Sequence, residues 1–558
     1  MHPGSSSVAI LGGGVGGLSA AQELAERGFA VTVYEADDAL GGKARSFEYE
    51  GDAEGPPLPG EHGFRFFPGF YTNLRDTMAR IPLAEGGTVA DNLVPTSETL
   101  VASVDGGESL SRSATPRTVS EWADALRPTI GNGELTARET NYFLRRLLVL
   151  LTSGRRRRER EFDAITWWEF VDAEERSPAY RKHLAESTQA LVAMRPQIAS
   201  ARTIGRIYVQ LMLDQIEPRR PTEAVLNGPT SVVWIRPWVA YLRSLGVEFR
   251  TGTPVTAIES DGHRVTGVVV DGADGSETVT ADHYVAAVPV EVMARLLTPA
   301  LTRAAPSLAG VRKLDTAWMN GLQFYLTDDA PLAHGHQAYT DSPWALTSIS
   351  QGQFWADGPF DLTGCADGSV QGVLSVIVSD WETPGVLFDK PASECTREEI
   401  VDEVWAQLTA HLNREDERLS AAALYDVVVD PAIVEAERGD RMDNQSPLLI
   451  NTVGSLRHRP DAVTEAPNLV LAADYVRTET DLATMESANE AARRAVAGVL
   501  DRAGVGPPPT VWGLDEPAVF EPLRRQDDVA CALGLPHPGE TERGLGRLLR
   551  EFRTRVGA

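Results

Sequence analysis

Cysteine is scarce in this sequence. Three of the 558 residues are cysteines, Cys365, Cys395 and Cys531, and they are too far apart to form a CxxC pair. A disulfide framework needs an even set of closely spaced cysteines, and zinc clusters use paired ligands. The scarcity argues against both, fits a reducing compartment, and leads us to predict no metal site.

Long apolar runs and an excess of basic charge are also missing. No stretch has the roughly 20 apolar residues of a membrane-spanning helix. The apolar run at 8–11 leads straight into glycines, without the longer apolar region of a signal peptide. The formal net charge of −27 repels nucleic-acid phosphates, so we expect no nucleic-acid partner. We expect a cytoplasmic protein, and its 558 residues predict two or more domains.

The first 35 residues have the pattern of a dinucleotide-binding βαβ unit. Residues 8–11 predict a buried strand, residues 18–25 have helical spacing, and residues 30–34 predict a second strand. The turn between the first strand and the helix contains Gly12, Gly14, Gly16 and Gly17. In this pattern the first glycine permits a tight turn, the second lets the backbone approach a pyrophosphate, and the last lets the helix pack against the strand.

The helix start and Glu35 complete this unit. Unpaired N–H groups and the positive end of the helix dipole suit a phosphate group. Glu35 lies 18 residues beyond Gly17, close to the spacing of about 20 expected for an acid that binds ribose hydroxyls. Because strand, turn, helix, second strand and acid follow in order, the sequence predicts a bound dinucleotide.

The next segment indicates which dinucleotide is bound. Residues 40–45, Leu-Gly-Gly-Lys-Ala-Arg, resemble a flavin motif of the FAD-dependent amine oxidase and carotene desaturase superfamily. In that family this turn lies against the FAD pyrophosphate. The resemblance implies that Gly42 and Arg45 contact phosphate, with Lys43 as a second cation.

A segment near the other end of the chain resembles the C-terminal flavin motif of the same family. Residues 468–475 predict a strand ending in acid Asp474, and residues 484–492 predict a helix start. The resemblance implies that Asp474 accepts from a ribityl hydroxyl and that N–H groups near Met485 face flavin N1 and the C2 carbonyl. In a strand pair expected beside the adenine, Val255 would contact FAD through its backbone.

The resemblance implies an α/β fold. It consists of a Rossmann-type FAD-binding domain and an α+β substrate domain, both discontinuous in sequence. We expect the FAD-binding domain at 1–82, 225–300 and 460–505. We expect the substrate domain at 83–224 and 301–459, followed by a C-terminal extension at 506–558.

Residues 61–74 indicate the branch of the family. They read Glu-His-Gly-Phe-Arg-Phe-Phe-Pro-Gly-Phe-Tyr-Thr-Asn-Leu and resemble a segment of plant- and cyanobacterial-type carotene desaturases; hydroxysqualene dehydroxylases carry a related version. Arg65 stands where those desaturases have histidine. It either binds an anionic substrate group, tunes the flavin or pairs with a structural carboxylate. The candidates for the flavin-facing wall are His62, Arg65 and Tyr71, and no catalytic dyad or triad is evident.

Three functions are compatible with these motifs. The first is a desaturase-like or dehydrogenase-like flavoenzyme that passes a hydride from an apolar, isoprenoid-like small molecule to FAD, with O₂ or a quinone as candidate electron acceptor. The second is an amine oxidase that uses O₂, although residues 481–483, Asp-Leu-Ala, lie where such enzymes often have a cage tyrosine. The third is a non-enzymatic binder related to GDP dissociation inhibitors.

A basic cluster stands out on this acidic chain. An apolar helix is predicted at 141–151, and residues 155–160, Arg-Arg-Arg-Arg-Glu-Arg, follow it closely. One interpretation is peripheral docking on anionic lipid headgroups, which would suit a lipid-soluble substrate. The other is a buried helix followed by a solvated turn whose arginines pair with nearby glutamates.

Overall fold

In the computed structural model, a parallel sheet gathers strands from across the whole chain. It is ordered β10-β2-β1-β14-β24, which are Glu248–Arg250, Ala30–Tyr34, Ser7–Leu11, His283–Ala286 and Leu469–Leu471. All four strand pairings are parallel, so the predicted Rossmann-type α/β fold is confirmed. The structure describes residues 6–51, 55–112, 135–216, 223–273, 275–437, 439 and 441–540.

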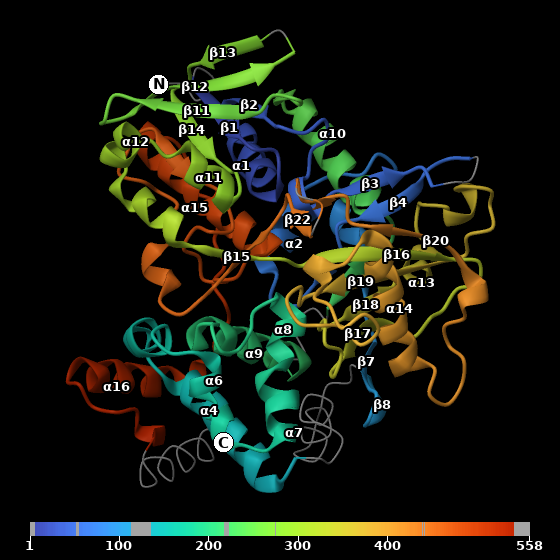
Figure 1. The fold of residues 1–558 in the computed structure, drawn as a ribbon. Helices are drawn as coiled ribbons and strands as arrows, with labels where there is room; N and C mark the ends of the chain where they lie inside the picture. The colour runs from blue at the N-terminus through green and yellow to red at the C-terminus, as the bar shows by residue number, and fades with distance from the viewer. Residues whose placement is uncertain are drawn as a thin grey trace.

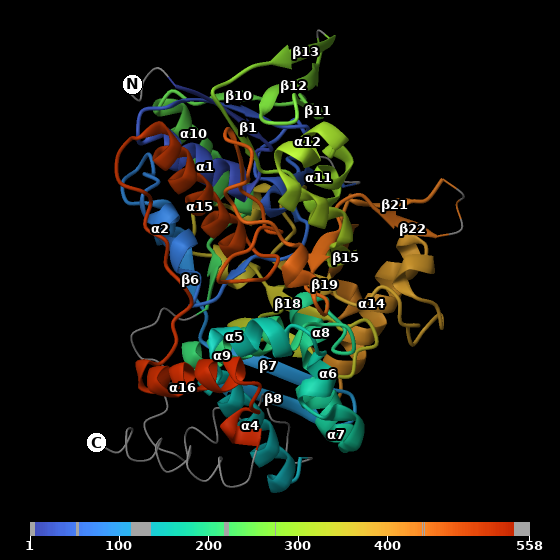
Figure 2. The same cartoon turned by 90° about the vertical axis from the view of Figure 1, so that its left-hand side faces the viewer.

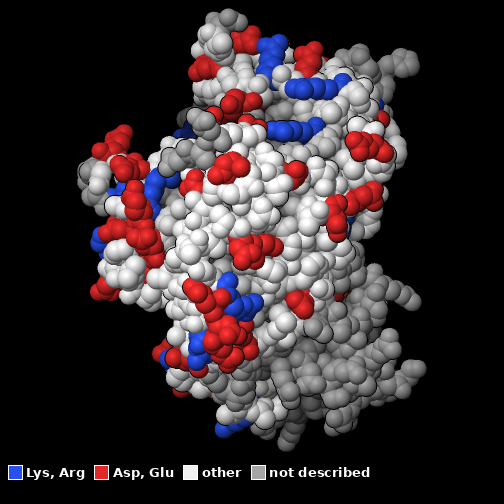
Figure 3. Space-filling view, turned by 90° about the vertical axis from the view of Figure 1, so that its right-hand side faces the viewer, with Lys and Arg blue, Asp and Glu red and all other residues white. Residues whose placement is uncertain are grey.

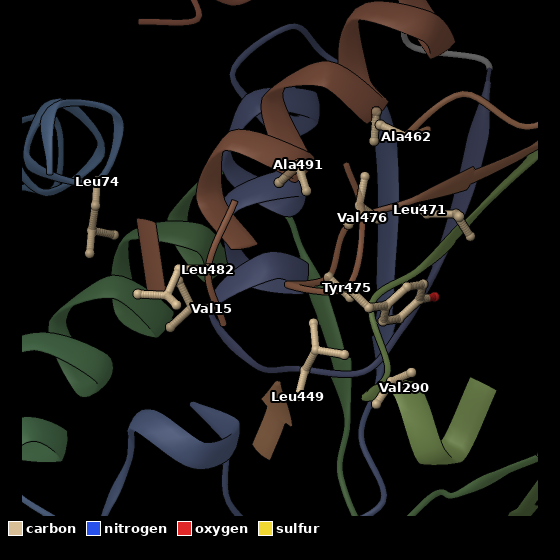
Figure 4. Close-up of a cluster of buried hydrophobic side chains, with 14 of the residues drawn as sticks. Val15, Leu74, Val290, Leu449, Ala462, Leu471, Tyr475, Val476, Leu482 and Ala491 are labelled. Carbon is tan, nitrogen blue, oxygen red and sulfur yellow. The ribbon is translucent and has the colours of Figure 1, made fainter. Parts of the chain in front are cut away.

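Two helices from opposite ends of the chain lie side by side against this sheet (Figure 1). They are α1, Val15–Ala25, and α15, Met485–Ala503. All residues of α1 are buried. Asn489 Nδ2 donates to Ser19 Oγ across the contact at 2.8 Å. Figure 4 shows Val15 and Ala491 in one cluster of buried apolar side chains. Small side chains permit this close approach of the two helices.

A small antiparallel sheet and three helices surround the parallel sheet at the top of Figure 1. The sheet contains β11, Val255–Ser260, β12, Val265–Gly272, and β13, Gly275–Val279. The helices are α10, Arg236–Ser244, α11, Val290–Leu296, and α12, Pro299–Ala304.

A seven-stranded sheet forms a second part of the molecule. It is ordered β20-β16-β19-β18-β17-β7-β8, which are Leu424–Val429, Asn320–Leu326, Gly372–Val378, Thr347–Ser350, Gly335–Tyr339, Glu98–Ser103 and Gly107–Arg112. Only the β17–β7 pairing is parallel in this sheet. Helix α14, Arg397–Leu412, packs Ile400 and Leu408 into the same core as Leu322 of β16.

A group of helices completes this part and lies below the parallel sheet in Figures 1 and 2. It contains α4, Ala137–Thr152, α5, Arg155–Arg157, α6, Trp167–Phe170, α7, Pro178–Tyr180, α8, Ser187–Val192, and α9, Ala201–Ile216. The helix predicted at 141–151 is confirmed within α4. This helix starts at a capping box in which Thr136 and Glu139 satisfy each other's backbone N–H groups.

Short elements connect the two parts. Helix α2 is Thr72–Ala79 and α13 is Gly352–Trp355. The paired short strands are β3, Ser46–Tyr49, with β4, Leu58–Glu61; β5, Phe66–Phe67, and β6, Leu93–Pro95, with β9, Ala224–Leu226; β15, Asp315–Ala317, with β23, Leu448–Ile450; and β21, Ile433–Glu435, with β22, Met442–Asn444.

The chain after α15 crosses from the parallel sheet to the helical group, where it forms α16, Glu521–Ala532. Asp527 on the buried face of α16 accepts from Gly154 N at 2.9 Å and from Arg157 Nε at 3.0 Å. Residues 541–558 of the expected C-terminal extension lie outside the described residues.

Among the described helices, none combines the length and the apolar character needed to span a bilayer. On the face drawn in Figure 3, Asp and Glu side chains are spread over the surface with Lys and Arg between them.

Candidate active site

A large cavity runs along the carboxyl ends of the parallel strands and continues between the seven-stranded sheet and the helical group. Its volume is about 1850 Å³. The carboxyl edge of an open parallel sheet is where such folds bind ligands. Thirteen of the predicted site residues line it, namely Gly12, Gly14, Gly16, Glu35, Gly42, Lys43, Arg45, His62, Arg65, Tyr71, Val255, Asp474 and Met485.

Within the glycine loop, Gly16 and Gly17 pack against protein backbone, whereas Gly14 faces open space. A Cβ atom on Gly16 would lie 1.9 Å from Ala472 O, and one on Gly17 would lie 1.9 Å from Gly12 O. A Cβ on Gly14 would meet nothing closer than Gly42 Cα at 3.8 Å. Gly14 is also the N-cap of α1 and has no side-chain hydrogen bond there. The loop and the helix start therefore present bare backbone to the cavity, which suits a phosphate.

Glu35 is held rigidly at the end of β2. Its Oε2 accepts from Gly13 N at 2.6 Å, and its Oε1 accepts from Asp37 N at 3.0 Å. Burial raises the pKa of the Glu35 carboxyl, and these two backbone donors oppose that shift. The side chain lines the cavity, so its orientation is fixed before any ligand contacts it.

The two predicted phosphate cations both contact protein groups. Arg45 Nη1 donates to Asp37 Oδ2 at 2.5 Å and to Ala39 O at 3.3 Å. Lys43 Nζ donates to Pro447 O. Both side chains line the cavity next to the glycine loop. Their contact with phosphate remains a prediction, and for Arg45 it would compete with the Asp37 pair.

Glu486 ties the start of α15 to the start of α2. Its two carboxylate oxygens accept from Asn73 N, Asn73 Nδ2 and Leu74 N, each at 2.8 Å. Burial raises the pKa of Glu486 to about 7, against these three hydrogen bonds. At the helix end, Thr484 Oγ1 caps α15 by accepting from Ser487 N at 3.1 Å. This arrangement places Met485 at the cavity wall close to Tyr71.

The loop before Thr484 is fixed by a buried ion network. Asp481 has a positive φ of 52° and is 1% exposed. It accepts from Arg459 Nη1 at 2.5 Å, from Thr203 Oγ1 at 2.9 Å and from Arg202. Burial alone would raise the pKa of Asp481, but Arg202 and Arg459 hold it below its usual value. The next residue, Leu482, lines the cavity in a defined position.

Arg65 links the segment at 61–74 to the turn at 40–45 by donating to backbone carbonyls in both. Nη1 donates to Gly63 O at 2.8 Å, Nε donates to Ala44 O at 3.4 Å, and Nη2 donates to Lys43 O. In the described part of the chain no carboxylate lies within 4 Å of its guanidinium. Burial lowers the pKa of Arg65, and nearby Glu61 opposes this shift. The arrangement does not match the ion-paired structural interpretation of Arg65.

Tyr71 lies deeper in the wall. It is 5% exposed, and its ring makes edge contacts with Phe67 and Phe70 at centroid distances of 6.5 and 5.3 Å. Burial raises the pKa of the Tyr71 phenol, and a hydrogen bond with Thr484 opposes that shift. Tyr71 therefore connects the start of α15 to the aromatic part of the cavity wall.

His62 has a partner that the sequence did not indicate. Its Nδ1 lies 2.8 Å from Asp430 Oδ1, and Asn320 Nδ2 donates to Asp430 Oδ2 at 2.7 Å. All three residues line the cavity. His62 and Asp430 are 368 positions apart, and no motif links them. The hydrophobic strand ending at 429 and followed by Asp-Pro was the one signal that could have placed an acid at a strand end.

Beyond these polar groups the cavity wall is largely apolar. The side chains that form it are Phe66, Phe70, Phe143, Leu144, Leu147, Val192, Ile207, Tyr208, Leu211, Met212, Leu482 and Ala483. They come from β5, α4, α8, α9 and the loops before α2 and α15. Residues 481–483 are Asp, Leu and Ala, where the amine oxidase hypothesis expects a cage tyrosine.

The basic cluster at 155–160 is partly internal. Arg157 is 1% exposed and pairs with Asp527 and Glu161. Arg158 pairs with Glu516. At the surface, Arg155 pairs with Glu159 at 2.7 Å and has a side chain that is 77% exposed. Two of the arginines are therefore structural, and those left at the surface are fewer than the sequence suggested.

The fold and this cavity define a two-part flavoprotein of the Rossmann type. The chain belongs to the flavin-containing amine oxidoreductase family, whose model matches residues 15–500. The superfamily resemblance stated from the motifs is thus confirmed, as is the prediction of a flavin-dependent oxidoreductase. The non-enzymatic hypothesis is set aside.

Several relatives align over most of the chain. A carotenoid phi-ring synthase of Streptomyces griseus is 25% identical over 93% of this chain and 92% of its own length. A zeta-carotene desaturase of Synechocystis is 25% identical over 88% of this chain and 97% of its own length. Among solved structures, a putrescine oxidase aligns with a TM-score of 0.60 at 14% identity, over 89% of this chain and 99% of that one. The last likeness concerns the fold alone.

Proposed function

We propose that this protein is an FAD-dependent dehydrogenase of the desaturase type that acts on an apolar, isoprenoid-like small molecule. The observation that carries the proposal is one continuous cavity of about 1850 Å³ with two distinct ends. One end has the glycine loop, Glu35 and the start of α15. The other has the aromatic and aliphatic wall.

The length of the polar end supports FAD over a mononucleotide. Glu35 suits the ribose of an adenosine, Gly14 suits a pyrophosphate, and Asp474 and Met485 suit the ribityl chain and the isoalloxazine. All four residues line the same cavity. A flavin mononucleotide would leave Glu35 without a ligand.

The size and lining of the cavity support a large apolar substrate beside the cofactor. Typical small-molecule pockets have volumes of about 300–1,000 Å³, so 1850 Å³ accommodates a dinucleotide and a second extended molecule. Burial of apolar surface contributes roughly 25 cal/mol per Å² to binding such a substrate. The relatives that align over most of this chain are named for carotenoids, which supports the same substrate class.

The residues of this chain would orient the reactants and exclude water. When bound, the flavin supplies a two-electron acceptor for a hydride. Leu482 and Phe70 would hold an apolar chain in a near-attack position. Backbone N–H groups at the start of α15 would stabilise negative charge on the reduced ring.

The direct test is anaerobic mixing of the purified protein with a panel of polyenes, terpenoids and amines. We expect the flavin absorption near about 450 nm to bleach with an isoprenoid polyene and not with amines. Bleaching by amines alone would overturn the substrate class.

One observation favours the amine oxidase alternative. The Glu223 carboxyl lines the cavity, and among the residues that the structure describes its buried Oε1 has no hydrogen-bond partner. Burial and then the nearby Asp214 carboxylate raise the pKa of Glu223 to about 7. A protonated amine would relieve both effects. The amine arm of the panel tests this alternative, and Glu223→Gln should abolish bleaching by amines if it is correct.

A further inference from the structure

The carboxylate of Asp430 is fixed before it meets His62. Its Oδ1 accepts from Ala432 N at 2.9 Å, and its Oδ2 accepts from Asn320 Nδ2 at 2.7 Å. The Asn320 carboxamide is itself held, because its Oδ1 accepts from Asn444 Nδ2 at 2.7 Å. Asp430 is 1% exposed. These donors fix the orientation of the Asp430 carboxylate and leave an acceptor site on Oδ1 that faces His62.

The contact with Asp430 defines which nitrogen of His62 faces the cavity. Nδ1 lies 2.8 Å from Asp430 Oδ1, and an ionised carboxylate can only accept, so Nδ1 carries a proton. In a neutral imidazole the lone pair is then on Nε2. Nε2 makes no hydrogen bond to any residue in the described ranges, and the His62 side chain lines the cavity with 16% of its surface exposed.

Few other charged groups face His62. On its own segment these are Glu61 and Arg65, whose charges act in opposite directions. Across from it, β20 leads into Asp430, while β16 contributes the neutral Asn320. From β3, the Phe47 ring makes an edge contact with the imidazole at 5.4 Å. The imidazole is therefore influenced chiefly by one paired carboxylate in a partly apolar wall.

Desaturation requires a base as well as a hydride acceptor. Removing a hydride from one carbon takes both electrons of that C–H bond to the flavin and leaves the carbon electron-deficient. The neighbouring carbon must then lose a proton, and the electron pair of its C–H bond becomes the new C=C bond. In a cavity with an apolar wall, a side chain has to accept that proton.

We propose that His62 Nε2 is this proton acceptor and that Asp430 is the residue that positions it. The proposal rests on the dehydrogenase function proposed above. A carboxylate that orients an imidazole and stabilises its protonated form is a recurring arrangement in general-base catalysis. His62 is then a catalytic residue. Asp430 acts through His62, and Asn320 acts by holding Asp430.

The first test reads His62 directly and needs no substrate. The ¹⁵N-histidine NMR spectrum of the purified full-length protein is recorded across pH, and the His62 signals are identified by their loss in His62→Gln. We expect the neutral tautomer with the proton on Nδ1 at high pH. In Asp430→Asn we expect this tautomer preference to be lost, because the carboxylate that accepts from Nδ1 is gone. A second buried pair, His411 Nε2 with Asp341 Oδ1 at 2.6 Å, serves as an internal reference.

The second test follows the rate of anaerobic flavin bleaching by an active polyene as a function of pH. We expect the rate to rise with pH through one ionisation in the parent and to fall about 100-fold or more in His62→Gln, with that pH dependence lost. Flavin content and substrate affinity should stay within twofold of the parent. The matched control is His263→Gln, because His263 lies in an exposed turn between β11 and β12.

The two tests separate failure of this inference from failure of the proposed function. A parental rate and pH profile in His62→Gln, or a His62 imidazole that holds its proton on Nε2, would overturn the role of His62. If no isoprenoid bleaches the parent, the dehydrogenase function fails, while the tautomer of His62 still decides whether Nε2 is available as a base. If Asp430→Asn does not fold, the bleaching rate of His62→Gln and the tautomer of His62 in the parent protein decide whether the inference holds.

Discussion

The nucleotide end and the substrate end of the cavity are built in different ways. At the nucleotide end, the site is shaped by closely packed backbone. A Cβ added at Gly16 or at Gly17 would lie 1.9 Å from a carbonyl oxygen. At the substrate end, side chains from distant segments meet, and His62 and Asp430 are 368 positions apart. The comparison teaches that cofactor binding depends on local geometry, whereas the chemistry depends on long-range pairing.

The largest expected effect lies at Asp481, which directly precedes Leu482 in the cavity wall. Asp481→Ala would leave Arg202 and Arg459 buried without their shared partner. Breaking a buried pair in this way costs about 3–5 kcal/mol. We expect the free energy of unfolding, measured by urea titration, to fall by that amount, with disturbed flavin binding because Leu482 follows directly. Asp389→Ala is the control, because Asp389 is exposed and has a similar φ of 53°. Equal effects in both would show that backbone strain, and not the ion network, is what matters.

The next contrast compares Gly16 with Gly14. Gly16→Ala forces a Cβ against Ala472 O and should destabilise the flavin-stripped protein by about 1–3 kcal/mol or more. Gly14→Ala has open space and a φ of −75°, which alanine adopts freely. It should leave the stripped protein's thermal midpoint unchanged and lower its flavin content at least tenfold. A Gly14→Ala protein that keeps its flavin would refute the phosphate assignment.

How far the sequence anticipated the structure follows the same division. The glycine turn, Glu35 and the helix at 484 were predictable because their spacing along the chain is itself the signal. Glu223 was not predictable, because its role depends on burial in the folded protein. Asp430 and Asn320 were not, because their roles depend on neighbours that come from distant parts of the chain. Arg157 was misleading for the same reason: a run of arginines looks solvated until Asp527 is placed beside it.

A smaller effect should appear in the pH dependence of stability. The pKa of Glu223 is about 7 in the folded protein, above its ordinary value of 4.5. Its contribution to stability is therefore fully present below about pH 4.5 and is lost as pH rises through about 7. We expect the thermal midpoint to decrease as the pH is raised from about 5 to about 8. Glu223→Gln should make this decrease smaller. Glu48→Gln, at an exposed position, should leave the slope unchanged. An unaltered slope in Glu223→Gln would place the effect elsewhere.

The smallest expected effect concerns the surface arginines beside α16. If Arg155 and Arg156 dock on anionic lipid, changing both to glutamine should weaken binding to phosphatidylserine vesicles by about 1 kcal/mol per arginine. Vesicle flotation measures this binding. The paired change of Arg236 and Arg250, exposed on the opposite part of the molecule, is the control. A parent protein that does not float with such vesicles would end the docking hypothesis.

The central claim is that the glycine loop after β1 and the start of α15 hold one dinucleotide between them. The most direct measurement is to release the cofactor from the purified protein and to identify and quantify it by mass spectrometry. The account predicts one FAD per chain, lost in Gly14→Ala. Flavin mononucleotide in its place, or a colourless protein that does not take up added FAD, would contradict it.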